Sequence, residues 1–144
     1  MLIRYLYFWF HSSNQHGVHS PFVFDLVSHC FFNKDWKKIK FFPFTNDQFK
    51  SLDRQFQEQL KNYFSHKVST TQTLYTLKFV TKDTDVKKLS AESNCIWVFS
   101  GLHSDRSQWV QKSKTATIRI DCFFWGILSF KKDQATESFY LRIV

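Results

Sequence analysis

The sequence predicts a single α/β domain, with helices at its amino end and a small mixed sheet toward its carboxyl end. Its 144 residues are 43% hydrophobic and 19% aromatic, which is the length of one domain and the composition of a chain with a sizeable core. Within residues 1–65, apolar positions recur at helical steps of three and four. Within residues 73–144, the period changes to two, which is typical of half-buried strands.

Two helices are expected before the sheet. Ser20 is placed to cap the first helix and Pro21 to open it, and apolar residues recur at helical spacing as far as Phe32. The second helix covers residues 47–64, where charged residues between the apolar positions are left for water. Each helix is therefore amphipathic, with one apolar stripe for the core.

The rest of the chain alternates strands and helices. Strands are expected at residues 75–80, 95–100, 115–124, 126–130 and 138–144. A short helix over residues 84–89 separates the first two strands, and another begins near Ser104 with Trp109 and Val110 turned inward. This alternation favours a parallel sheet, and the last three strands, joined without room for a helix, are expected to close it antiparallel.

Several side chains of the sheet portion are expected to be structural. Aromatic residues at strand spacing predict core positions rather than a platform for nucleic-acid bases; they are Trp97, Phe99, Phe123, Phe124, Trp125 and Phe130. Alternation points Asp121 toward solvent or toward Arg119. The cysteines Cys30, Cys95 and Cys122 have neither CxxC nor zinc-finger spacing, so we expect buried thiols in a reducing cytoplasm.

Basic residues exceed acidic ones by 20 to 12, and the formal net charge is +8. The surplus is spread along the chain without a basic tail. Its densest cluster consists of Lys34, Lys37, Lys38 and Lys40 around Trp36, which makes a nucleic-acid-binding patch one interpretation. A solvated lysine face is the other.

The amino end is apolar from residue 1 to residue 10 except at Arg4. Its uninterrupted run, residues 5–10, is too short for the apolar region of a signal peptide or for a spanning helix of about 20 residues. We therefore expect no transmembrane segment and a cytoplasmic protein. Contact of these rings with a membrane surface remains an alternative.

Two stretches at the ends of the chain carry family motifs. Residues 14–27 read NQHGVHSPFVFDLV, and residues 96–144 contain IWVFSGLHSDRSQWV followed by TIRIDCFFWGILSFKKDQATESFYLRIV. Together they resemble a family of bacterial class I methyltransferases, common in the Bacteroidota, that depend on S-adenosylmethionine. The resemblance implies a Rossmann-like fold in which the second stretch supplies the fifth core strand, its helix and the terminal antiparallel strands.

The cofactor-binding features of this family are absent from the sequence. The family uses a glycine-rich turn and a following acidic residue to hold S-adenosylmethionine, as dinucleotide folds do, but no glycine lies between Phe24 and Leu89. Family members are also longer, and residues 33–94 stand where the first half of their sheet is expected. The resemblance therefore implies a truncated methyltransferase half-sheet without a cofactor.

Catalytic residues of the family are also replaced. An acidic pair before a histidine reads here as Ser100 and Gly101 before His103, which leaves His103 as the one candidate base. At the amino end, His16 and His19 have the spacing of two metal ligands, but no Cys, Asp or Glu lies close by. The favoured interpretation is structural, with His16, His19, Ser20, Pro21 and Phe22 forming the entry to the first helix.

These observations favour a degenerate methyltransferase-like domain that is not an enzyme by itself and acts through protein–protein interaction. A truncated sheet exposes an edge and an apolar face, which a partner protein or a second copy would cover. Two alternatives remain. One is a basic nucleic-acid-binding module, and the other is a methyltransferase active only with a partner that supplies the missing half.

Overall fold

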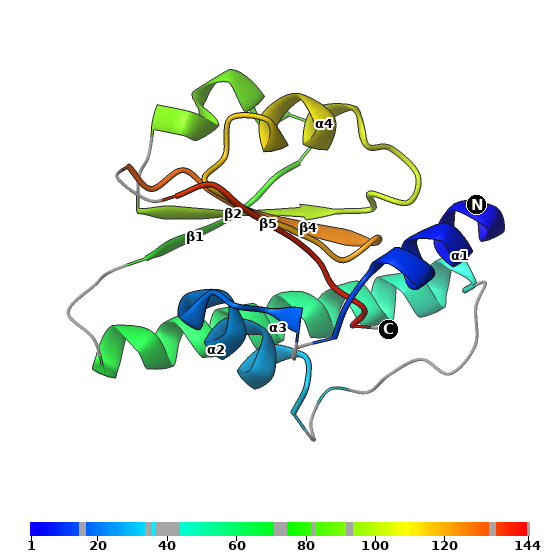
Figure 1. Cartoon of the computed structure of the whole chain (residues 1–144), viewed down its shortest axis with the longest axis horizontal. Coiled ribbons are helices and arrows are strands. Elements are labelled where there is room, and N and C mark those ends of the chain that lie inside the picture. The colour runs from blue at the N-terminus through cyan, green and yellow to red at the C-terminus, as the bar shows by residue number, and fades with distance from the viewer. Residues whose placement is uncertain are drawn as a thin grey trace.

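The computed structural model describes residues 1–14, 17–33, 36, 44–70, 75–81, 83–91, 94–132 and 135–143. They form a five-stranded sheet with helices on both faces (Figure 1). The strands are β1 (Thr76–Phe79), β2 (Cys95–Ser100), β3 (Ile118–Asp121), β4 (Trp125–Ser129) and β5 (Glu137–Tyr140). The helices are α1 (Leu2–His11), α2 (Pro21–Cys30), α3 (Asn46–Thr70), the 3-10 helix η2 (Val86–Ala91) and α4 (Ser107–Ser113). The α/β class is as predicted.

The strand order is β1-β2-β4-β3-β5. β1 and β2 are parallel, as predicted, and β4 is antiparallel to both of its neighbours, β2 and β3. The expectation that all three terminal strands are antiparallel was wrong for β5, which runs parallel to β3. β5 runs antiparallel to β4, but it pairs with β3 and not with β4. Because β3 is also antiparallel to β4, β3 and β5 run in the same direction.

Element ends differ from the predictions where the backbone turns. β3 ends at Asp121 because the next residues form a tight turn, in which Phe123 has a φ of 67°. α4 begins at Ser107 rather than near Ser104. Trp109 is buried, as predicted, but the inward direction of Val110 was wrong, because adjacent helical residues point about 100° apart and Val110 is half exposed.

Both faces of the sheet are covered (Figure 1). Ile96 and Val98 of β2 belong to the core beneath α2 and α3, whereas Trp97 and Phe99 belong to the core beneath η2 and α4. Close contact on the second face depends on Gly126, where a Cβ atom would collide with the ring of Trp109. The six aromatic residues and the three cysteines predicted to be buried are all buried, and no disulfide joins the cysteines.

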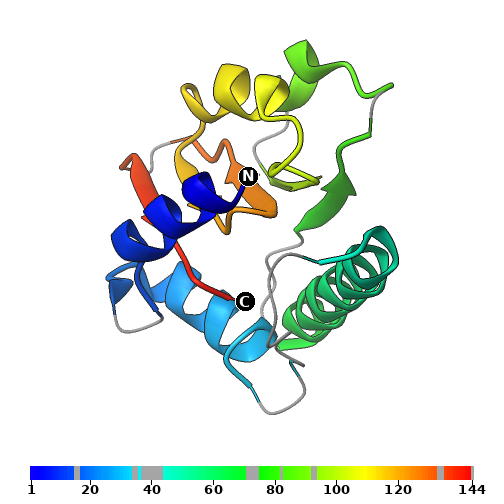
Figure 2. The same ribbon diagram turned by 90° about the vertical axis from the view of Figure 1, so that its right-hand side faces the viewer.

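α1 lies at one side of the sheet, next to β5 (Figure 2). Tyr5 and Phe8 hold it there through ring contacts with Phe123, at centroid distances of 5.1 and 5.4 Å. The backbone after the helix joins the sheet, since the Ser13 amide donates to Tyr140 O at 2.8 Å. None of the described helices has both the length and the apolarity to cross a membrane.

Candidate functional site

The carboxyl end of β2 holds the residue that the sequence marks as a candidate base, and α3 covers this end on one face. Ser100 Oγ donates to Asp53 Oδ1 at 2.5 Å, and Trp125 Nε1 donates to the same oxygen at 2.7 Å. Gly101 follows with a φ of 76°, a left-handed conformation that glycine adopts readily. Gly101, which stands where the resembled family has an acidic residue, therefore makes the turn that ends the strand.

His103 lies in aromatic packing beyond this turn. Its ring centroid is 4.7 Å from that of Phe49 and 5.1 Å from that of Phe124. Its Nδ1 atom is buried and has no hydrogen-bond partner among the described residues. Burial lowers the pKa of His103, which favours the neutral ring. A neutral imidazole between two phenyl rings, with no carboxylate on Nδ1, is suited to packing rather than to proton transfer.

A small cavity of about 270 Å³ opens at the carboxyl ends of β1 and β2, on the α4 side. Thr81, Phe99, Gly101 and Trp109 are among the residues that line it, and His103 is not. Its one acidic residue, Asp105, accepts a hydrogen bond from the Ser107 amide at 2.9 Å. This cavity therefore brings no candidate base together with a carboxylate.

The amino-terminal motif surrounds the start of α2. Pro21 occupies the first turn, and Ser20 is buried at the N-cap position, although its hydroxyl makes no cap hydrogen bond. Phe22 packs against Tyr75 at 5.7 Å, whereas His19 is exposed. No metal-binding group of His, Cys, Asp and Glu occurs in the described part of the chain. The other residues of interest, His16, Lys34, Lys37, Lys38 and Lys40, lie outside the described residues.

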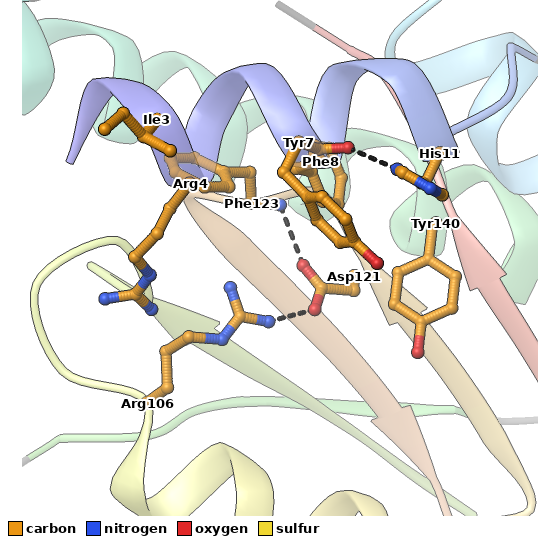
Figure 3. A pocket seen from close by; sticks show the side chains of 9 residues that line it. All are labelled: Ile3, Arg4, Tyr7, Phe8, His11, Arg106, Asp121, Phe123 and Tyr140. Atoms are coloured by element: carbon orange, nitrogen blue, oxygen red, sulfur yellow. Dashed lines mark hydrogen bonds and ion pairs between the residues drawn. The ribbon is translucent and has the colours of Figure 1, made fainter.

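A cavity of about 670 Å³ lies between α1 and the sheet, and we call it the α1 cavity (Figure 3). One flank of α1 forms one wall, and the loop before α4, the end of β3 and the end of β5 form the other. Its lining residues are Ile3, Arg4, Tyr7, Phe8, His11, Arg106, Asp121, Phe123 and Tyr140. These segments are far apart in sequence, so no local motif marks this cavity.

The wall of the α1 cavity that lies across from α1 contains an ion pair between Arg106 and Asp121. Arg106 Nη2 donates to Asp121 Oδ2, and the Phe123 amide donates to Asp121 Oδ1 at 2.9 Å (Figure 3). Burial raises the pKa of Asp121, and the nearby Arg106 guanidinium opposes that shift. The predicted exposure of Asp121 to solvent was wrong, because the side chain is buried and pairs with Arg106. The alternative, a position beside Arg119, is compatible with the structure, since both residues line one small cavity.

Arg4 contributes a second guanidinium to the α1 cavity. Its side chain and that of Arg106 extend toward the same end of the cavity (Figure 3). Within the described part of the chain, the side chain of Arg4 makes no hydrogen bond or ion pair. His11 is already engaged, since its Nδ1 lies 2.7 Å from Tyr7 O and its ring stacks on that of Tyr7 at 4.1 Å.

The side of α1 that faces away from the sheet is entirely apolar. We call it the outward arc, and it comprises Leu2, Leu6, Trp9 and Phe10, which do not line the α1 cavity. Phe10 is 74% exposed and Leu2 is 52% exposed. α1 buries none of its residues, although Arg4 and His11 are its only polar ones. Surface helices ordinarily turn a polar face to water, so this arc is an unusual surface.

The described part of the chain thus has a mixed α/β fold with a cationic cavity and an exposed apolar helix face. In comparisons with known proteins, no family model, no curated protein and no solved structure matches the chain.

Proposed function

We propose that this chain is a non-catalytic, methyltransferase-like domain that binds another protein through the outward arc of α1. The observation that carries the proposal is that a helix with only two polar residues, Arg4 and His11, has no fully buried residue and exposes most of its apolar side chains. Burying exposed apolar side chains contributes roughly 25 cal/mol per Å². A partner that covers Leu6 and Phe10 would gain this free energy of burial without any rearrangement of the domain.

The orientation of α1 is fixed before any partner arrives. Tyr5 and Phe8 face Phe123 on the sheet, and residues on the opposite side of the helix therefore point away from the domain. A rigid apolar helix face is the ligand in helix-in-groove recognition, where anchors at positions i, i+4 and i+7 enter a hydrophobic groove. Leu2, Leu6 and Trp9 have that spacing here, and all three are exposed.

Charge favours an acidic partner. Arg4 lies on one flank of the outward arc, and on the other the Arg142 guanidinium lies over the Trp9 ring at 4.7 Å. The whole chain carries a formal charge of +8, which opposes association of two copies and favours a groove with acidic residues at its rim. Membrane-surface helices carry a Lys- and Arg-rich polar face, whereas the inner face of α1 is aromatic and packed.

The site geometry supports a non-catalytic role. His103 is held between Phe49 and Phe124, and the strand end beside it carries Ser100 and Gly101 where the resembled family has acids. Asp53 of α3 accepts a hydrogen bond from Ser100 at this strand end, from one face of the sheet. The parallel pairing of β1 with β2 and the antiparallel β3–β4 pair are compatible with the truncated half-sheet that the resemblance implies.

Site-specific photo-crosslinking tests the proposal. A photoreactive phenylalanine analogue is placed at Leu6 in the full chain, and, in a matched control, at the similarly exposed Val110 on α4. We expect a distinct protein adduct from the Leu6 position in cells that express the protein and none from the Val110 position. Crosslinks to lipid alone, to a second copy of the chain, or equally from both positions would contradict the proposal.

A further inference from the structure

We infer that the α1 cavity is a binding site for a small carboxylic acid with an aromatic body. This site uses the flank of α1 and the ends of β3 and β5, and it does not depend on the protein partner proposed above. Residues from four separate segments converge on it, which distinguishes it from a surface groove formed by one element (Figure 3).

The charges of the α1 cavity are unbalanced. Two guanidinium groups, those of Arg4 and Arg106, face one carboxylate, that of Asp121. Both oxygens of Asp121 already accept hydrogen bonds, one from Arg106 and the other from the Phe123 amide. Asp121 is also buried and fixed at the end of β3, so it remains the partner of Arg106. One positive charge is therefore left to attract an anion.

A carboxylate matches this remaining charge. It carries a single negative charge and two coplanar oxygens, which fit the parallel N–H donors of a guanidinium. A phosphate monoester brings about 1.5 to 2 negative charges at neutral pH and would exceed the surplus. Arg106 has N–H groups beyond the one that binds Asp121, and the Arg4 donors are free of described protein partners, so both can turn toward the same ligand.

The walls of the cavity select an aromatic body. Tyr7, Phe8, Phe123 and Tyr140 line the cavity beside the cationic end. The Phe8 ring contacts those of Phe123 and Tyr140, at centroid distances of 5.4 and 6.5 Å, so these walls support one another before a ligand enters. A volume of about 670 Å³ accommodates a small organic ligand, since such sites span roughly 300–1,000 Å³.

Isothermal titration of the full chain with 3-phenylpropionate tests the site. The neutral 3-phenylpropan-1-ol has the same ring and chain and lacks the carboxylate. We expect the acid to bind at least about tenfold more tightly than the alcohol, and Arg4→Gln to lose about that factor, because charge-assisted hydrogen bonds to the ligand are removed. Arg4 is exposed, so this substitution leaves the fold intact.

Arg54→Gln is the matched control, because it removes the same charge from an exposed position on α3 and should leave the affinity unchanged. Equal affinity for acid and alcohol, equal loss in both variants, or no binding of the acid at millimolar concentration would overturn the inference. The tripeptide Gly-Gly-Phe distinguishes the two sources of an aromatic carboxylate. Tighter binding of this tripeptide than of 3-phenylpropionate would overturn the small-acid assignment in favour of a chain terminus.

Discussion

α3 and α1 are both rich in aromatic residues, yet the fold uses them in opposite ways. In α3, Leu52, Phe56 and Leu60 lie on one stripe and are at most 2% exposed, while charged residues occupy the other side. In α1 the apolar residues surround the helix, and none is fully buried, since even Tyr5 and Phe8 are only partly covered. The apolar surface of α3 therefore stabilises the domain, whereas the apolar surface of α1 remains available for contact with another molecule.

The centre of the α3 stripe should give the largest loss of stability. Phe56 is stacked between Phe31 and Trp125, at 4.8 and 4.6 Å, and is fully buried. We expect Phe56→Ala to lower the free energy of unfolding by about 3–5 kcal/mol in urea denaturation, because it leaves a cavity among the rings. Phe10→Ala in α1 should change it by no more than about 0.5 kcal/mol. Similar losses for both would remove the contrast between the helices.

A smaller loss is expected from the polar contact that holds α3 over the end of β2. Asp53→Ala leaves the Trp125 Nε1 and Ser100 Oγ donors without their acceptor. We expect a loss of roughly 1–3 kcal/mol in the same denaturation experiment. Asp53→Asn keeps an acceptor oxygen at this place and should lose less. If Asp53→Ala has wild-type stability, the carboxylate does not fasten α3 to the strand.

His103 should produce a still smaller effect, visible in the pH dependence of stability. Burial lowers its pKa below the ordinary 6.5, so the unfolded chain binds the proton more readily than the folded one. The resulting stabilisation is fully present above pH 6.5 and is lost as the pH falls through the lowered pKa. His103→Phe should therefore lose less stability than wild type between about pH 7 and pH 5. Identical pH profiles for wild type and His103→Phe would show that packing does not lower the pKa of the imidazole.

The outward arc should contribute least to folding. Leu6 and Phe10 are exposed, and neither belongs to the core clusters. The double variant Leu6→Ser/Phe10→Ser should keep its free energy of unfolding within about 1 kcal/mol of wild type, as substitutions at exposed positions usually do. A loss as large as that of Phe56→Ala would place α1 in the folding core.

Local patterns predicted α2, α3 and the strands but not the helix α1, and long-range packing decided the rest. β2 occupies Cys95–Ser100 as its apolar run predicts, and α2 begins at Pro21. Asp121 was misplaced because strand alternation assigns a side chain to a face and does not say what covers that face. Here the loop that carries Arg106 closes over it.

The α1 cavity could not be found from the sequence for the same reason. Arg4 interrupts an apolar run that gives no sign of a binding site, and Arg106 lies in a loop about a hundred positions away. Only the docking of α1 through Tyr5 and Phe8 brings the two guanidinium groups to one cavity. The exposed outward arc, by contrast, has a visible sequence signal in the near absence of polar residues from 1 to 10.

The affinity of the crosslinked partner, purified and titrated against the full chain, tests most directly whether the outward arc is a protein-binding surface. We predict that Leu6→Ser/Phe10→Ser weakens binding by at least about tenfold, as the loss of buried interface anchors does. Val110→Ser, which removes a half-exposed apolar side chain from α4, should leave the affinity unchanged. Equal affinities for wild type and both variants would contradict the proposed role of α1.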